Sequence, residues 1–113
     1  MGTDITIIDD PLRIRGLGAH PFDGEGVRTK PLTIVENGVL QTWALDARSA
    51  RQLGLTSNGC AGRGASSPPS PSLGNMHMQP GRVTPHDLMA DIGEGIYITE
   101  LMGSAINGIT GDY

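Results

Sequence analysis

The segment that decides the fold is residues 21–55, PFDGEGVRTKPLTIVENGVLQTWALDARSARQLGL. Near its centre, Asn37-Gly38 separates two runs that are rich in apolar residues. Asn-Gly is the strongest two-residue hairpin signal, because both residues tolerate positive φ. The run after it is rich in β-branched, aromatic and large apolar side chains, which is typical of a strand. The sequence therefore predicts a β-hairpin over residues 28–45.

Capping signals predict two short helices. Asp46 is placed to accept a hydrogen bond from the first turn of a helix over residues 47–53, and Gly54 is placed to end that helix. Thr84 has the same position before a helix over residues 85–92, whose first residue is a proline. Proline suits that position because its missing N–H would have no partner within the helix.

The remaining apolar runs predict strands. In the first of them, isoleucines at alternate positions indicate a strand with one buried face. With the hairpin, these runs indicate a β-dominated α+β fold that combines an antiparallel sheet with two short helices. The expected strands are residues 3–8, 28–35, 39–45, 75–79 and 96–102.

Some single residues have an expected place in this fold. Trp43, the only tryptophan, is expected to anchor the core or an interface. Asp9 and Asp10 are expected in a solvated turn after the first strand. Residues 23–26 predict a tight turn of small residues. A loop that borders a substrate groove is the alternative, because glycines allow a close approach of another chain.

Residues 57–74, SNGCAGRGASSPPSPSLG, consist mostly of glycine, serine and proline. They contain too little apolar surface to offset the entropy of ordering, so a flexible loop without a packed core is expected. Cys60 lies in this loop, and no histidine or other base is near it in the sequence. It is therefore not expected to act as a nucleophile.

Composition limits the classes of function. The chain has 113 residues, enough for one small domain, and a formal net charge of -4. This charge argues against a nucleic-acid surface, which needs a basic patch. A single cysteine excludes an internal disulfide, which suits a cytoplasmic protein. No apolar run approaches the roughly 20 residues of a membrane span.

The sequence carries no catalytic or metal-binding motif. HExxH, HExxxH, GxSxG and Walker sequences are absent, and the three histidines lack the spacing of metal ligands on one helix. We therefore expect no catalytic residue, no metal ligand and no cofactor in this chain.

A resemblance covers nearly the whole chain. The runs PFDGEGV, ENGVLQTWALD and SARQLGL are followed by PSPSLGNMHMQPG, TPHDLMADIGEGIYITELMG and TGDY. These runs, in this order, resemble the TldD/PmbA (TldE) family, whose members are often labelled modulators of DNA gyrase and are classed as metallopeptidases. The PFDGEG form and the missing metal motif favour the PmbA/TldE branch. The resemblance implies that residues 1–113 are part of the C-terminal domain of a larger, β-rich protein.

The resemblance also implies a function. A PmbA/TldE-type subunit, itself without a metal site, would pair with a TldD-like subunit that can hold zinc. The resulting cytoplasmic peptidase complex would act in peptide maturation and in the proteolysis of unfolded peptides. The alternative is a non-enzymatic, β-rich protein-interaction module. A stand-alone metalloenzyme is disfavoured, because the ligands are absent.

Open sheet edges suggest how such a chain contacts its substrate. An extended peptide can add to an exposed edge as a further strand, through main-chain hydrogen bonds. The same edges predict self-association of the chain. The resemblance places family-motif residues near strand ends, and these are the candidate substrate-binding positions: Asn75, His77, Thr99, Glu100, Gly103, Asn107 and Asp112.

Overall fold

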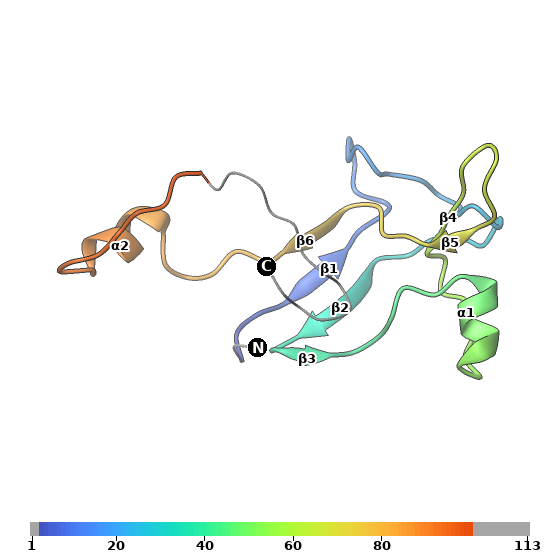
Figure 1. The fold of residues 1–113 in the computed structure, drawn as a ribbon, viewed down its shortest axis with the longest axis horizontal. Coiled ribbons are helices and arrows are strands. Elements are labelled where there is room, and N and C mark those ends of the chain that lie inside the picture. Colours follow the sequence, from blue (N-terminus) through green and yellow to red (C-terminus); the bar gives the residue numbers. More distant parts are fainter. Residues whose placement is uncertain (1–2, 101–113) are drawn as a thin grey trace. The chain divides into compact units, whose positions relative to one another are not determined.

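The computed structural model describes residues 3–100. The chain divides into two compact units, Met1–Gly81 and Arg82–Tyr113. The described part of the first unit holds four strands that form one antiparallel sheet: β1 (Ile7–Asp9), β2 (Leu32–Glu36), β3 (Val39–Leu40) and β6 (Met76–Met78). The strand order across this sheet is β3-β2-β1-β6, as Figure 1 shows. The expected β-dominated fold with antiparallel pairing and two short helices is confirmed.

The Asn-Gly hairpin forms as predicted, but its first arm begins at Leu32 rather than at residue 28. Asn37 has φ 50° and Gly38 has φ 78°, and the turn joins β2 to β3. On its other side β2 pairs with β1 through a β-bulge, because Ile7 opposes Val35 whereas the next residue of β1 opposes Thr33. A bulge of this kind increases the local twist of the sheet.

The second arm of the hairpin is shorter than predicted, since β3 ends at Leu40 rather than at residue 45. The amide side chain of Asn58 takes the place of a partner strand. Its Nδ2 donates to the carbonyl oxygen of Trp43 at 2.7 Å, and its Oδ1 accepts the N–H of Leu45 at 3.0 Å. Trp43 remains 61% exposed, so the expectation of a core position is wrong.

Helix α1 (Ala47–Gln52) follows its capping signals. The Asp46 side chain accepts the N–H of Ser49 at 2.7 Å, and the Ser49 hydroxyl accepts the N–H of Asp46 at 3.2 Å. This reciprocal pair is a capping box. After the helix, Gly54 has φ 68°, the left-handed conformation that ends helices. Both predicted ends are confirmed to within a residue.

The second unit contains helix α2 (Pro85–Ala90), capped by Thr84 with a proline at its first position, as predicted. None of its residues is buried among those that the structure describes. The strand expected over residues 96–102 is wrong for residues 96–100, which form no strand, and Ile96 is 93% exposed. A β-pattern becomes a strand only when a partner pairs with it. No helix within residues 3–100 is long and apolar enough to cross a membrane.

The Gly/Ser/Pro segment 57–74 is more ordered than its composition suggests. It contains a small ladder between β4 (Ala61–Gly62) and β5 (Ser70–Pro71), and Cys60 and Ala61 are buried. The expectation that nothing in this segment packs is therefore wrong for its first part. Hydrogen bonds from polar groups of other segments hold this first part in place. The prediction considered only the apolar area that the segment can bury, so it did not include these bonds. The flexibility of the rest of the segment stays a prediction.

The core of the described residues is small. Its buried apolar side chains are Val35, Leu45, Ala50, Cys60 and Ala61. Three aspartates are buried as well: Asp9, Asp23 and Asp46. Buried carboxylates mark either a reactive site or a structural one, and the groups that bind their oxygens decide between the two.

Candidate functional site

Asp9 binds backbone N–H groups rather than facing solvent. It is only 2% exposed, so its expected place in a solvated turn is wrong. Its Oδ1 accepts the N–H of Asn75 at 2.7 Å, and its Oδ2 accepts the N–H of Gly74 at 3.3 Å. Both carboxylate oxygens thus accept N–H groups from one short segment of backbone. Asp9 therefore fixes the start of β6 to the end of β1.

Asp23 has a similar structural role in the PFDGEG segment. Its Oδ1 accepts the N–H groups of Glu25 and Val27, at 2.9 and 2.8 Å, and its Oδ2 accepts the N–H of Ala61 at 3.2 Å. The Gly24 N–H in turn donates to the Ala61 carbonyl oxygen at 2.6 Å. The expected tight turn over residues 23–26 is present, and it also holds β4 in place.

These contacts leave no ligand set for a metal within the described residues. No group of three or more His, Cys, Asp and Glu side chains in residues 3–100 could hold a metal ion. The buried carboxylates of Asp9 and Asp23 are occupied by N–H donors. We therefore derive no metal-dependent step from this part of the chain.

The Cys60 thiol is buried beside these acids. Burial raises the pKa of the Cys60 thiol above its ordinary value, and the negative charge of Asp9 raises it further. Because the thiolate is the nucleophilic form, a raised pKa keeps this sulfur protonated and unreactive near neutral pH. Cys60 contributes to the core and not to a reactive site.

The open edge of the sheet offers a different kind of site. Among residues 3–100, strand β6 is the last strand on one side of the sheet, and its partner on the other side is β1. The Gln79 N–H donates to the Thr6 carbonyl oxygen at 2.9 Å, which makes these two residues a hydrogen-bonded pair. Hydrogen-bonded and non-bonded pairs alternate along an antiparallel ladder. His77, opposite Ile8, is therefore the next hydrogen-bonded residue of β6.

This alternation directs the backbone of Met76 and Met78 away from β1. Their N–H and C=O groups point to the open side of the sheet, where an extended chain can pair with them. Met76 and Met78 are 57% and 60% exposed, whereas His77 is half-buried. Methionine side chains are flexible and apolar, so they adapt to different partners. The β6 edge is thus a candidate peptide-binding edge.

Asn75 holds the neighbouring loop against the start of β6. Its Nδ2 donates to the Asp10 carbonyl oxygen at 3.0 Å, and its Oδ1 accepts the N–H of Gly18 at 2.9 Å. Both ends of the amide are thus bound within the chain, which gives Asn75 a structural role. The His77 Nδ1 lies 3.1 Å from the Asn75 carbonyl oxygen. A substrate contact by either side chain stays a prediction.

The loop that Asn75 holds contains a second feature that the sequence did not reveal. A hollow of about 260 Å³ opens in it. Arg15 has φ 61°, a left-handed conformation that is uncommon outside glycine. Within residues 3–100, neither Arg13 nor Arg15 forms an ion pair. The lining residues are Pro11, Leu12, Arg13, Ile14, Arg15, Ala19, His20 and Pro21.

The other candidate residues belong to the second unit or lie outside the described part. Thr99 and Glu100 are exposed and lie in no helix or strand. Gly103, Asn107 and Asp112 lie outside the residues that the structure describes, so their placement stays a prediction.

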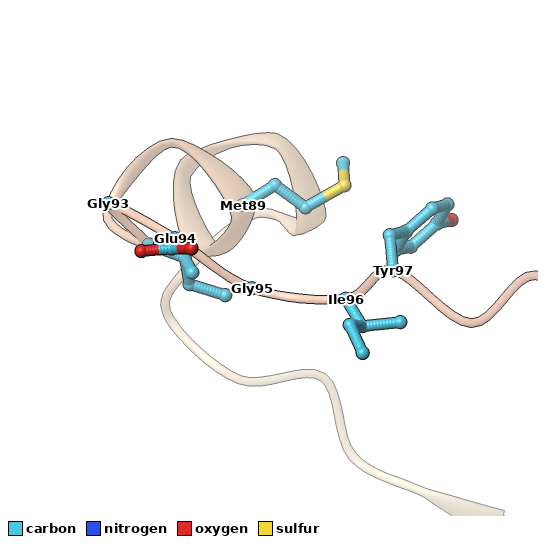
Figure 2. Close-up of a pocket in the computed structure, with 7 residues that line it drawn as sticks. Met89, Gly93, Glu94, Gly95, Ile96 and Tyr97 are labelled. Carbon is cyan, nitrogen blue, oxygen red and sulfur yellow. The ribbon is translucent and has the colours of Figure 1, made fainter.

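Close to Thr99 in the sequence, Met89 and residues 92–97 line a hollow of about 260 Å³. Figure 2 shows Met89 and Tyr97 pointing to one side of the backbone and Ile96 to the other. Apart from the Glu94 carboxylate and the Tyr97 hydroxyl, the lining side chains are apolar, so we assign no chemistry to this hollow.

Comparison with known proteins gives consistent results. The model of the family described as "PmbA/TldA metallopeptidase C-terminal domain" matches residues 1–113. The chain is 38% identical over 109 residues to "Metalloprotease PmbA" of Escherichia coli, covering 96% of this chain and 22% of that protein. It is 39% identical over 111 residues to "Metalloprotease PmbA homolog" of Haemophilus influenzae, with the same two coverages.

A solved structure supports the fold. The crystal structure of TldE from Thermococcus kodakarensis superposes with a TM-score of 0.72 at 26% identity, covering 80% of this chain and 21% of that one. The present chain thus spans about a fifth of the length of the curated relatives that it matches.

Proposed function

Because this chain belongs to the PmbA/TldA metallopeptidase family, we propose that it holds unfolded peptide substrate, in an extended form, on the open edge of β6. The outward backbone groups of Met76 and Met78 carry this proposal. Main-chain pairing requires few particular side chains, which suits substrates that share only an extended conformation.

We place the chain in a PmbA/TldE-type subunit of a two-subunit peptidase. The PmbA relatives and the TldE structure support that branch, as does the PFDGEG sequence. In this proposal a TldD-like subunit supplies the zinc and the bond cleavage, and the present chain supplies substrate contacts. The complex acts in the cytoplasm, in peptide maturation and in the proteolysis of unfolded peptides.

The substrate contacts in this proposal come from two regions. The β6 edge provides main-chain bonds, with His77 beside them. The second region comprises the remaining family-motif positions Thr99, Glu100, Gly103, Asn107 and Asp112. An alanine substitution at Thr99 or Asn107 that leaves peptide turnover by the whole complex unchanged would remove that residue from this set.

A proline on the open edge tests the β6 site. In Met78→Pro the outward N–H is lost, whereas the hydrogen bonds to β1 remain, because proline is tolerated on the free side of edge strands. Met78→Ala is the matched control, since it removes the thioether side chain and keeps the N–H. Binding of a fluorescent unfolded peptide, measured by anisotropy, is expected to be lost in Met78→Pro and retained in Met78→Ala. Equal binding by both variants would contradict pairing at this edge.

Cleavage is tested separately by mass spectrometry of the peptide. The chain alone is expected to bind the peptide and leave it intact, and cleavage is expected only with the longer subunit and a TldD-type partner. Cleavage by the chain alone would refute the division of roles. Binding of a folded partner protein, without binding of unfolded peptide, would instead support the protein-interaction module.

The open edges also lead us to propose that copies of the chain associate. Strands β3 and β6 lie at the two ends of the strand order, and unpaired edges favour pairing between chains. Light scattering at about 100 µM, within the range where exposed edges aggregate, is expected to give a mass above that of one chain. A monomeric mass would count against this self-association.

A further inference from the structure

Building on the proposed peptide binding, we infer that the hollow in residues 11–21 is a carboxylate subsite at one end of the β6 edge. Arg13 and Arg15 are the groups that bind the carboxylate. The subsite selects peptides that present either a free C-terminal carboxylate or an acidic side chain at this position.

The hollow lies in a loop that is bound to the start of β6. The Asn75 amide joins Gly18 and Asp10 of this loop to the residue directly before β6. In the view of Figure 1, the blue segment that follows β1 extends past β6 on the side away from β2. A peptide that lies along the open edge therefore has one of its ends near this loop.

Basic side chains line the hollow. The chain as a whole carries a net charge of -4, yet two arginines and a histidine line this one hollow. Within the described residues, the arginines have no acidic partner. Guanidinium groups bind carboxylates through paired, charge-assisted hydrogen bonds. The His20 Nδ1 donates to the Gly18 carbonyl oxygen at 2.6 Å, which gives His20 a role in holding the loop.

The backbone of Arg15 has an unfavourable conformation. Its φ of 61° costs free energy in any residue with a Cβ, and glycine would adopt the same conformation without strain. Strained residues of this kind cluster at sites where the side chain is used. An arginine at this position is therefore better explained by a role of its guanidinium group than by the requirements of the turn.

The subsite also fixes the direction of the peptide. The loop contacts the N-terminal end of β6. A peptide that pairs antiparallel to β6 brings its C-terminal end there, whereas a parallel peptide brings its charged amino group. The positive charges attract the first and repel the second. A peptide bound through its C-terminal carboxylate is therefore antiparallel to β6.

Four forms of one apolar, fluorescent, unfolded peptide test the subsite. The C-terminus is either free or amidated, and the last residue is either Glu or Gln. For the whole chain we expect the forms with a carboxylate to bind about fivefold to tenfold more tightly than the amidated Gln form, the effect of two exposed ion pairs. The preference is expected to shrink in about 0.3 M salt. Tighter binding of the forms with a free C-terminus would identify the C-terminal carboxylate as the ligand, and tighter binding of the Glu forms would identify the acidic side chain.

Variants separate the subsite from the fold. Arg13→Gln with Arg15→Gln is expected to abolish the preference and leave binding of the amidated Gln peptide unchanged, and Arg82→Gln, in the other unit, is expected to change neither. Arg15→Gly removes the guanidinium group and relieves the backbone, so it should weaken the preference without lowering the melting temperature. Equal binding of all four forms would overturn the subsite and leave the β6 proposal standing. If no form binds, the β6 proposal itself fails.

Discussion

Replacing Asp23 by alanine is expected to lower the free energy of unfolding by about 3 kcal/mol. The substitution removes the acceptor of three backbone N–H groups. The Ala61 N–H is buried, and an unsatisfied buried donor costs about 1–3 kcal/mol. The N–H groups of Glu25 and Val27 are nearer to solvent and recover part of their loss from water, so we assign them about 1 kcal/mol together. This total is a large share of the stability of a small domain, about 5–15 kcal/mol.

Urea unfolding near neutral pH, followed by circular dichroism, measures this loss. Asp10→Ala is the matched control, because the Asp10 carboxylate accepts only the exposed N–H of Leu12, at 3.0 Å. Its effect should stay within about 0.5 kcal/mol. Asp23→Asn keeps the shape of the side chain and one acceptor oxygen, so its loss of unfolding free energy should lie between those of Asp10→Ala and Asp23→Ala. A loss below about 1 kcal/mol in Asp23→Ala would refute the argument that this carboxylate holds β4 in place.

Three further predictions concern single side chains. Gly18→Ala should lower the free energy of unfolding in urea by about 1–3 kcal/mol, because its Cβ would lie 2.1 Å from a backbone carbonyl oxygen. Gly81→Ala is the control and should be neutral, because the space around Gly81 is open. Equal effects of the two substitutions would contradict this packing. Alkylation of Cys60 by iodoacetamide should be much slower in the folded chain than in urea, because burial raises the pKa of the thiol above its ordinary value of 9.0, and similar rates would show an accessible thiolate. The hydrogen bonds from the Ser49 hydroxyl and N–H lower the pKa of Asp46 below its ordinary 3.8, so its stabilising effect is complete above that pH and is lost as the pH falls through the lower folded value. Asp46→Ala should therefore flatten the acid unfolding curve, and an unchanged curve would argue against this contribution.

Local signals were sufficient for the hairpin and for both helices. Asn37-Gly38, the cap at Asp46 and the cap at Thr84 act within a few residues, so the sequence around each one determines its geometry. The length of β3 was not predictable in this way. The side chain that replaces its partner strand is Asn58, which lies 13 residues beyond Leu45 in the chain.

The order in segment 57–74 was missed for a related reason. Its composition indicates how little apolar area it can bury, but not that Asp23 accepts the N–H of Ala61 from 38 residues away. The solvated turn predicted at Asp9 failed in the same way, because its partners Gly74 and Asn75 are more than 60 residues distant. Long-range bonds to the backbone leave no periodic signal in a sequence.

The candidate site was predictable in part. The sequence indicated a strand over residues 75–79, and the resemblance pointed to Asn75 and His77. Which backbone groups face the open side depends on the register with β1, which the structure supplies. The strained backbone of Arg15 has no sequence signature at all.

Backbone amide exchange, measured by NMR with and without an unfolded peptide, tests the β6 edge most directly. We expect the peptide to slow exchange at Met76 and Met78, whose N–H groups it would bind. His77 should change little, because its N–H is already bonded to β1. Tight binding of the peptide with unchanged exchange at both methionines would show that the substrate lies elsewhere.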